Sequence, residues 1–135
     1  MPRLLFVAVL LACAAPALAQ GFMGAAEARR TFLGIDMEGV HRPSGERWRE
    51  CIDRRGKTTY WFAGTIDEGR LTVRNDGALC FAYASRNYQD TGCWRIRPQG
   101  RGAFRFENVD GDRGVFVTTS TRRVSVCQGA EVPVS

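Results

Sequence analysis

The sequence predicts an all-β protein. It is an antiparallel meander of eight or nine short strands that closes into a small barrel or folds into a two-sheet sandwich, with a short N-terminal helix and two disulfides. Three observations lead to this fold class. From residue 35 onward, turn-forming residues interrupt the chain about every eight to twelve residues. Between these breaks, large apolar residues alternate with polar ones, as on strands with one buried face. Four cysteines fall out of phase with the large apolar residues.

The clearest strand signal lies in residues 70–98. Two alternating runs flank an Asn-Asp-Gly turn at 75–77, and a polar loop at 86–92 leads to a third run. The short Asp-Gly turn predicts a hairpin. Cys80 and Cys93 have the opposite phase from the apolar residues of their strands. Because successive side chains point to opposite faces, the two thiols can meet without displacing the core.

The first 19 residues have the three parts of an export signal peptide: Arg3, an apolar run from Leu4 to Ala12, and a small-x-small site at Ala17-Leu18-Ala19. The apolar run is shorter than the ~20 residues that span a bilayer, and no transmembrane segment is expected later in the chain. A bacterial lipoprotein site ending in Cys13 is a second interpretation, which we disfavour because its signal would be very short. Cleavage at Ala19 leaves a chain of one-domain length.

Residues 20–34 form an N-terminal arm in this interpretation. Within the arm, Ala25–Phe32 consists mainly of good helix formers, and Gly34 is placed to end a helix. One or two helical turns are expected. So short a helix has to pack on the domain to be stable.

The barrel domain is assigned to residues 35–128. Residues 64–69 are predicted to be a loop, and residues 129–135 a frayed tail. Because short connections make neighbouring strands antiparallel, the domain is expected to be a meander, and closure into a barrel removes its exposed edges. Outside residues 70–98, the predicted strands cover 35–41, 46–53, 57–63, 103–109, 114–119 and 122–127.

The mature chain has four cysteines, an even number that predicts disulfides in a short exported domain. Cys51 lies near the start of the strand series and Cys127 at its end, so a Cys51–Cys127 bridge would join the first and last parts of the sheet. This pairing favours the barrel over the sandwich, and Cys80–Cys93 would then join adjacent strands. Four cysteines allow three pairings, and phase alone leaves the other two open.

The net charge of +5 falls to +4 once Arg3 is removed. So small an excess is not a nucleic-acid signature, and an exported protein rarely meets nucleic acid. The outward phase of the strands is rich in arginine, which predicts either a solvated exterior or a docking surface for an acidic partner. The arginines assigned to this outer face are Arg47, Arg49, Arg70, Arg74, Arg95, Arg97, Arg105 and Arg123.

Glu50 is the residue that fits the pattern least. It shares its phase with Trp48 and Ile52, so an inward-facing strand would place a carboxylate in an apolar interior. Such a group needs a cationic partner or has a raised pKa. Arg122, in phase with Val124, is the expected partner, and we hypothesise that Glu50 and Arg122 form a polar spot that orients a ligand. The alternative is an exposed strand end with a solvated Glu50.

Aromatic residues are numerous for a chain of this size. Most of them are expected in the core, and Tyr60, Trp48 and Trp94 join Glu50 and Arg122 as candidate ligand-binding residues. A small eight-stranded barrel is either filled by its side chains or leaves room for one small ligand. Periodicity does not decide between the two.

No catalytic, metal or cofactor site is expected. His41 is the only histidine, and a pair with Ser44 or Ser125 has no acid placed to orient it, so His41 is predicted to be a solvated loop residue. With one histidine and no C-x-x-C motif, the zinc spacing is missing. Residues 108–114 alternate oxygen-bearing side chains like a calcium loop. Their glycine comes one place late, and Thr119 stands where a bidentate glutamate belongs, so a hairpin turn is expected.

The run Gly77-Ala78-Leu79-Cys80-Phe81, followed by Gly92-Cys93-Trp94, resembles a pattern in small secreted proteobacterial proteins of unknown function. These proteins look calycin-like, that is, small antiparallel barrels related in shape to lipocalins. The resemblance covers about a third of the mature chain. It implies a barrel and brings no catalytic residues.

Two functions are therefore expected. The first is an exported, periplasmic or secreted, non-catalytic barrel that binds a small apolar ligand or a cell-envelope component. The alternative is an inhibitor of a secreted or lysosome-like hydrolase, a protease or a lysozyme. Lipocalin-like metalloprotease inhibitors use a free N-terminal arm, which residues 20–30 match in position, and residues 86–91 form a second candidate segment. The Ser-Gly-x-x-Tyr loop of lipoprotein-type lysozyme inhibitors is missing from the sequence.

Overall fold

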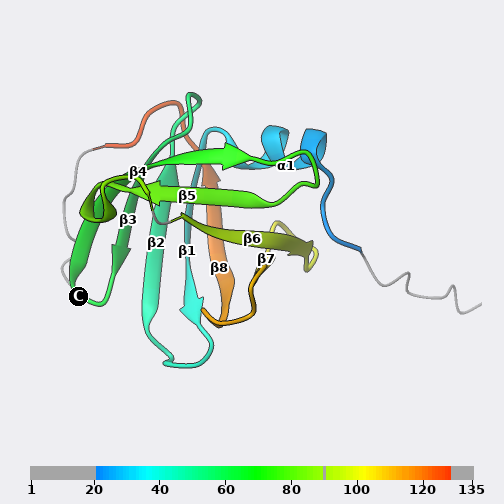
Figure 1. The fold of residues 1–135 in the computed structure, drawn as a ribbon. Coiled ribbons are helices and arrows are strands. Elements are labelled where there is room, and N and C mark those ends of the chain that lie inside the picture. Colours follow the sequence, from blue (N-terminus) through cyan, green and yellow to red (C-terminus); the bar gives the residue numbers. More distant parts are fainter. Residues whose placement is uncertain (1–20, 90, 129–135) are drawn as a thin grey trace, which may run out of the picture.

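The computed structural model describes residues 21–89 and 91–128. These residues form one antiparallel sheet of eight strands, closed into a barrel, and one helix (Figure 1). The prediction of an all-β closed meander with a short N-terminal helix is confirmed. The proposed signal peptide at residues 1–19, the Cys13 site and the tail at 129–135 lie outside the described residues.

Each strand pairs with its neighbours in sequence, and β1 also pairs with β8, which closes the barrel. A short 3-10 turn, η1 (Ala84–Arg86), lies between β5 and β6. The other elements, in chain order, are α1 (Ala25–Phe32), β1 (Ile35–His41), β2 (Arg47–Ile52), β3 (Lys57–Phe62), β4 (Thr65–Val73), β5 (Leu79–Tyr83), β6 (Thr91–Pro98), β7 (Phe104–Asn108) and β8 (Val115–Arg123).

Two predicted boundaries are wrong. Residues 64–69 are not a loop, because β4 begins at Thr65 and pairs with β3. The start of β4 is polar and largely exposed, which conceals the alternation there. The two final strands predicted at 114–119 and 122–127 are the single strand β8, followed by residues 124–128 outside the sheet. The threonines in the middle of β8 favour its continuation as a strand.

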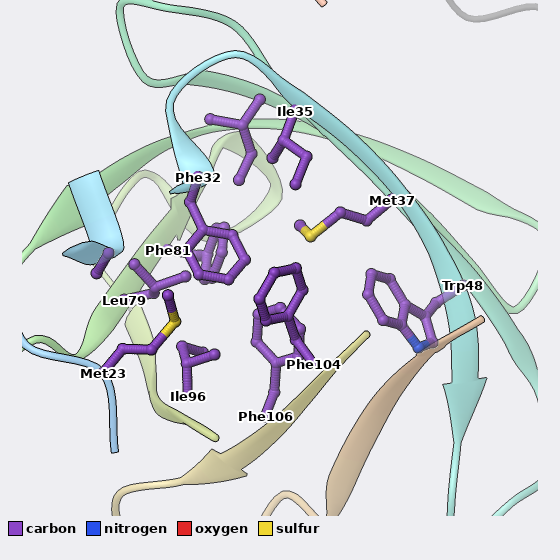
Figure 2. Close-up of a cluster of buried hydrophobic side chains, with 12 residues drawn as sticks. Met23, Phe32, Ile35, Met37, Trp48, Leu79, Phe81, Ile96, Phe104 and Phe106 are labelled. Carbon is purple, nitrogen blue, oxygen red and sulfur yellow. The ribbon is translucent and has the colours of Figure 1, made fainter. Parts of the chain in front are cut away.

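The helix α1 packs over the end of the barrel at which β1 begins, which we call the closed end. Ala28 and Phe32 lie four residues apart, so they share one helix face, and both are fully buried. The ring of Phe32 meets those of Phe104 and Phe106 edge-on, with centroids 5.0 and 5.6 Å apart (Figure 2). This apolar cluster fills the closed half of the barrel. At eight residues α1 is too short to cross a membrane, and no helix within the described residues meets that requirement.

Arg123, at the end of β8, fixes the C-terminus of α1. Its guanidinium donates hydrogen bonds to the carbonyl oxygens of Thr31, Arg30 and Leu33. The last carbonyls of a helix have no partner within the helix, so these bonds satisfy groups that are otherwise left unpaired. Arg123 therefore lies at the closed end, beneath α1, and its assignment to the outer face of the barrel is wrong.

The arm that precedes α1 is docked on the barrel. Met23 is buried, and its N–H donates to the carbonyl of Ile96 at 2.8 Å. The arm passes close over the turn between β4 and β5, where Gly77 has a φ of 87° and a Cβ would lie 2.1 Å from the Met23 carbonyl oxygen. The guanidinium of Arg97 lies over the ring of Phe22, with Cζ 4.0 Å from the ring centroid. From residue 21 onward, the arm is not a free extension.

Asp36 joins the first and last strands of the barrel on the outer face. Its carboxylate accepts two hydrogen bonds from Arg49 on β2, at 2.9 and 2.8 Å, and one from Arg122 Nε on β8 at 2.9 Å. Burial raises the pKa of Asp36, but the hydrogen bonds and charges of Arg49 and Arg122 outweigh it and hold the pKa below its ordinary value. Asp36 is only 4% exposed, so it lies as a carboxylate beneath its two arginines.

The predicted pairing of Arg122 with Glu50 is wrong, because Arg122 faces outward. A β-bulge shifts the register of the β1–β8 ladder between Glu38 and Gly39. Since a bulge adds one residue to one strand, it moves the following side chains to the other face. Arg122 thereby lies opposite Asp36. The apolar phase of Val124 does not extend back to Arg122, because the chain leaves the sheet after β8.

Both predicted disulfides are present, Cys51–Cys127 and Cys80–Cys93. Cys80 and Cys93 are directly opposite each other on β5 and β6. Cys127 lies beyond β8, so its bridge fastens the segment after the last strand to β2. The Cys51–Cys127 bridge therefore spans the region where the barrel closes.

We predict that loss of the two bridges has unequal effects. Cys51 and Cys127 are 76 residues apart and Cys80 and Cys93 are 13 apart. Because a longer closed loop restricts the unfolded chain more, Cys51→Ser with Cys127→Ser is expected to lower the free energy of unfolding by about 4.5 kcal/mol, and Cys80→Ser with Cys93→Ser by about 3 kcal/mol. Urea unfolding of the two double variants measures both values. A larger loss for the Cys80–Cys93 pair would contradict the assignment of the long bridge to barrel closure.

We also predict that Asp36→Asn lowers the free energy of unfolding by about 3 kcal/mol at pH 7, because it removes the charge that pairs with a largely buried arginine. A carboxyl with a lowered pKa stabilises the fold above its ordinary pKa, and this contribution is lost as the pH falls through the lower folded value. The difference between variant and wild type should therefore shrink below about pH 4.

Glu107→Gln is the matched control, because Glu107 also accepts from two arginines, Arg97 and Arg105, but at a more exposed site. Its loss should stay below about 1 kcal/mol. Equal losses for the two variants, measured by urea unfolding between pH 3 and pH 7, would show that Asp36 has no special part in closing the barrel.

Candidate functional site

A cavity of about 280 Å3 lies inside the barrel, in the half away from α1. Its walls come from strands on all sides, and its rim comes from the β5–β6 and β7–β8 connections at the end opposite α1, which we call the mouth. Eight of the lining residues are aromatic. The lining residues are Met37, Trp48, Glu50, Tyr60, Phe62, Phe81, Tyr83, Arg86, Trp94, Phe106, Arg113 and Phe116.

Four of the five candidate ligand-binding residues lie together at this cavity: Glu50, Tyr60, Trp48 and Trp94. Each points inward because it shares a strand phase with buried neighbours, as the alternation predicts. The fifth candidate, Arg122, bonds Asp36 on the outer face, and its side chain is 69% exposed. The cavity therefore combines the predicted aromatic residues and the predicted acid without the predicted arginine.

Three glycines within strands make room for three aromatic residues of the cavity. A Cβ at Gly92 would stand 1.9 Å from the ring of Trp94, and a Cβ at Gly69 would stand 2.7 Å from the ring of Tyr83. A Cβ at Gly39 would stand 2.6 Å from the ring of Trp48. A strand glycine commonly marks such a close approach. These glycines are the sequence signal that could have indicated where the large rings fold back over the sheet.

The aromatic rings form a continuous lining. Tyr60 and Tyr83 stack with centroids 5.5 Å apart, and Phe81 stacks on the other side of Tyr83 at 6.1 Å. Phe116 approaches Trp94 edge-on at 6.1 Å, from the opposite side of the intervening strand β7. The walls therefore present ring faces and edges to any molecule in the cavity.

Glu50 is 4% exposed and forms one hydrogen bond, accepted at Oε2 from the hydroxyl of Tyr83 at 2.8 Å. Burial raises the pKa of Glu50 to about 8, and the charge of Asp67 adds to this effect. The side chains of Thr58 and Tyr83 act in the opposite direction, although Thr58 forms no hydrogen bond of ordinary geometry with the carboxyl. At pH 7 Glu50 is therefore mostly a neutral carboxylic acid. Burial also raises the pKa of Tyr83, so its hydroxyl keeps its proton.

Three buried polar atoms of the lining residues have no hydrogen-bond partner within the described part of the chain: Trp48 Nε1, Trp94 Nε1 and Glu50 Oε1. Buried polar atoms in folded proteins are nearly always paired. The side chains that line the cavity thus include two indole N–H groups and one carboxyl oxygen with unused bonding capacity. A bound molecule with polar groups could satisfy them.

The rim of the mouth contains two arginines that sequence reasoning did not select, Arg86 after β5 and Arg113 before β8. Both side chains have interaction partners in the protein. They belong to connections rather than strands, so no periodicity signals that they face the cavity. His41 completes this end, with its ring 4.6 Å from that of Phe116 and 5.6 Å from that of Phe62.

His41 is half-buried between these two rings rather than solvated, and it bonds Ser44. His41 Nδ1 lies 2.7 Å from Ser44 Oγ, which also accepts the N–H of Glu46, and His41 Nε2 lies 3.4 Å from the Arg113 carbonyl oxygen. No carboxylate of the described residues hydrogen-bonds this imidazole. The contacts hold the β1–β2 connection against the mouth.

The calcium-like segment forms a turn between β7 and β8. Asn108 accepts the N–H of Asp110 through its side-chain oxygen and donates from Nδ2 to the Cys93 carbonyl. These bonds occupy the Asn108 side chain within the protein. In the described part of the chain, no group of three or more His, Cys, Asp and Glu residues is placed to hold a metal ion.

Most of the arginines predicted for the outer face have acidic neighbours. Arg47 lies 3.8 Å from Glu38, Arg74 lies 3.0 Å from Asp76, and Arg97 and Arg105 share Glu107. Exposed pairs of this kind contribute little to stability but offset much of the positive field of the barrel wall.

Comparison of the chain with protein-family models, with curated proteins and with solved structures gives no match.

We predict that Glu50 makes the protein less stable as the pH rises. A carboxyl whose pKa is raised from 4.5 to about 8 keeps its proton in the folded state while the unfolded chain releases it. Its contribution to stability is complete below pH 4.5 and is lost as the pH rises to about 8, by up to about 1.4 kcal/mol per pH unit.

Glu50→Gln keeps an acceptor for Tyr83 but does not titrate, so it should become progressively more stable relative to the wild type between pH 5 and pH 8. Urea unfolding across this range measures the difference, and Glu46→Gln, an exposed glutamate at the mouth, serves as the control. A constant difference between the Glu50 variant and wild type would mean that Glu50 ionises normally in the folded protein.

Proposed function

We propose that this chain is an exported, non-catalytic binding protein that holds a small, largely apolar ligand inside its barrel. The observation that carries the proposal is the aromatic-lined cavity of about 280 Å3. A water molecule takes ~30 Å3 in the liquid, so the cavity has room for roughly nine or ten non-hydrogen atoms. The ligand is either a free small molecule or the apolar end of a cell-envelope component that enters at the mouth.

The arrangement of the side chains supports binding over mere filling. Small barrels of this strand number are commonly packed solid or hold one ligand. Here Gly39, Gly69 and Gly92 remove side-chain volume from the inward faces, and the rings above them fold back toward the sheet. Ligand cavities are typically apolar with a few polar groups, and this lining has aromatic rings with one carboxyl and two indole N–H groups.

Two further observations support the remaining parts of the proposal. Two disulfides in so short a chain are typical of proteins outside the reducing cytosol. The contacts of His41 with Ser44 and Arg113 are accounted for by the turn that they stabilise, which supports a non-catalytic role. The docked N-terminal arm counts against an inhibitor that acts through a free arm, and the cavity favours ligand binding, whereas residues 86–89 of the second candidate segment are exposed.

We predict saturable binding of tert-butylbenzene, a neutral probe of about ten non-hydrogen atoms that matches the cavity in size. Trp48 and Trp94 line the cavity, whereas Trp61 lies on the outer face beneath Arg49. The probe should therefore change the fluorescence of the Trp61→Phe variant. The variant with Trp48→Phe and Trp94→Phe, which retains only Trp61, should show no change.

Calorimetric titration gives the stoichiometry, which is expected to be one probe per chain. The proposal fails if neither tert-butylbenzene nor other neutral probes of this size bind saturably. A response confined to Trp61 would also contradict it, because binding would then be on the outer face of the barrel.

A further inference from the structure

Among the described residues, Glu50 is the only acidic one that lines the cavity, and its neighbours in the lining are mostly aromatic. We propose that the cavity selects a small organic cation with an ammonium centre, for which Glu50 is the counter-ion and the aromatic rings form the cage. This inference rests on the proposed binding function and specifies the chemistry of the ligand. It is distinct from the expected acidic partner, which would meet the outer face.

One oxygen of the Glu50 carboxyl accepts a hydrogen bond and the other does not. Oε2 accepts the Tyr83 hydroxyl, and Oε1 has no hydrogen-bond partner within the described residues. A buried carboxyl that is left half-satisfied costs stability. A positive centre in the cavity would compensate this cost, because it favours the ionised carboxylate directly.

The rings around Glu50 suit a cation. The faces of aromatic rings carry negative electrostatic potential, and their attraction for an ammonium group strengthens when water is excluded. Tyr60 and Tyr83 stack beside Glu50, Trp48 is on the same strand as Glu50, and Trp94 lines the cavity from β6, across the barrel from β2. Aromatic cages are the arrangement by which proteins recognise quaternary ammonium groups.

The distribution of charge permits a cation to enter. The described connections at the mouth carry three basic and three acidic residues, and the adjoining strands add Arg47 and Asp67. The rim is therefore of mixed charge rather than uniformly positive. The charged residues of the connections are Arg42, Arg86, Arg113, Glu46, Asp110 and Asp112.

Binding of a cation should ionise Glu50. The charged and titratable groups placed around Glu50 are Tyr60 on β3, Asp67 on β4, Tyr83 on β5, and Arg86, Arg113 and His41 at the mouth. Burial raises the pKa of both tyrosines, so they stay protonated. Since burial raises the pKa of Glu50 to about 8, a permanent cation should bind more tightly as the pH rises toward 8.

Three probes of one shape test the inference: phenyltrimethylammonium, tert-butylbenzene and benzenesulfonate, which carry charges of about +1, 0 and −1 on about ten non-hydrogen atoms each. At pH 8 the wild-type protein should bind the cation at least about tenfold more tightly than the neutral probe, and the anion least tightly. Affinity for the cation should rise by up to about tenfold per pH unit between pH 6 and pH 8. Calorimetric titration measures all three affinities.

Glu50→Gln should abolish the preference for the cation over the neutral probe and remove the pH dependence. Glu38→Gln, on the outer face beside Arg47, should keep both. Equal or tighter binding of tert-butylbenzene overturns the inference and leaves the proposed function standing. Tightest binding of benzenesulfonate also overturns it, because the arginines of the rim would then select the ligand. If none of the three probes binds, the proposed function fails as well.

Discussion

Closure of the sheet between β1 and β8 is the constraint on which the rest of the structure depends. β1 is hydrogen-bonded on one side to β2 and on the other to β8, so the barrel exists only while both ladders hold. The buried carboxylate of Asp36 binds an arginine from each neighbour, and the Cys51–Cys127 bridge holds the chain after β8 against β2. Arg123, at the end of β8, links this region to α1 by hydrogen bonds. Covalent, ionic and hydrogen-bonded contacts thus all lie where β1 and β8 close the barrel.

The cavity is a consequence of this closure. In sheet order two strands separate β2 from β5, yet the Tyr83 hydroxyl on β5 reaches Glu50 on β2 across the interior. Gly69 on the intervening strand β4 leaves the space that the ring of Tyr83 occupies. At the closed end Phe32 fills the corresponding space with a helix side chain. The same barrel is therefore packed in one half and hollow in the other.

The sequence predicts the parts of this fold that depend on local alternation. The inward phase of Trp48 and Glu50 and the outward phase of the cysteines follow from neighbours two residues away. The outward position of Arg122 does not follow from its neighbours along the chain. The bulge in the β1–β8 ladder reverses its phase, and a bulge depends on the partner strand. The contact of Glu50 with Tyr83 crosses the barrel, so no spacing along the chain encodes it. The sequence does not predict the start of β4 as a strand, because its exposed residues show no alternation of apolar and polar side chains.

Glu50 is the feature that packing alone leaves without a reason. A glutamine at this position could accept the same hydrogen bond from Tyr83 and would have no ionisation to suppress. An acid is instead buried at a site that raises its pKa, so the fold loses stability wherever the unfolded chain would release the proton. Departures of this kind from the rules of packing are concentrated at functional sites. What an acid offers here, and an amide does not, is a negative charge that appears when a positive one enters the cavity.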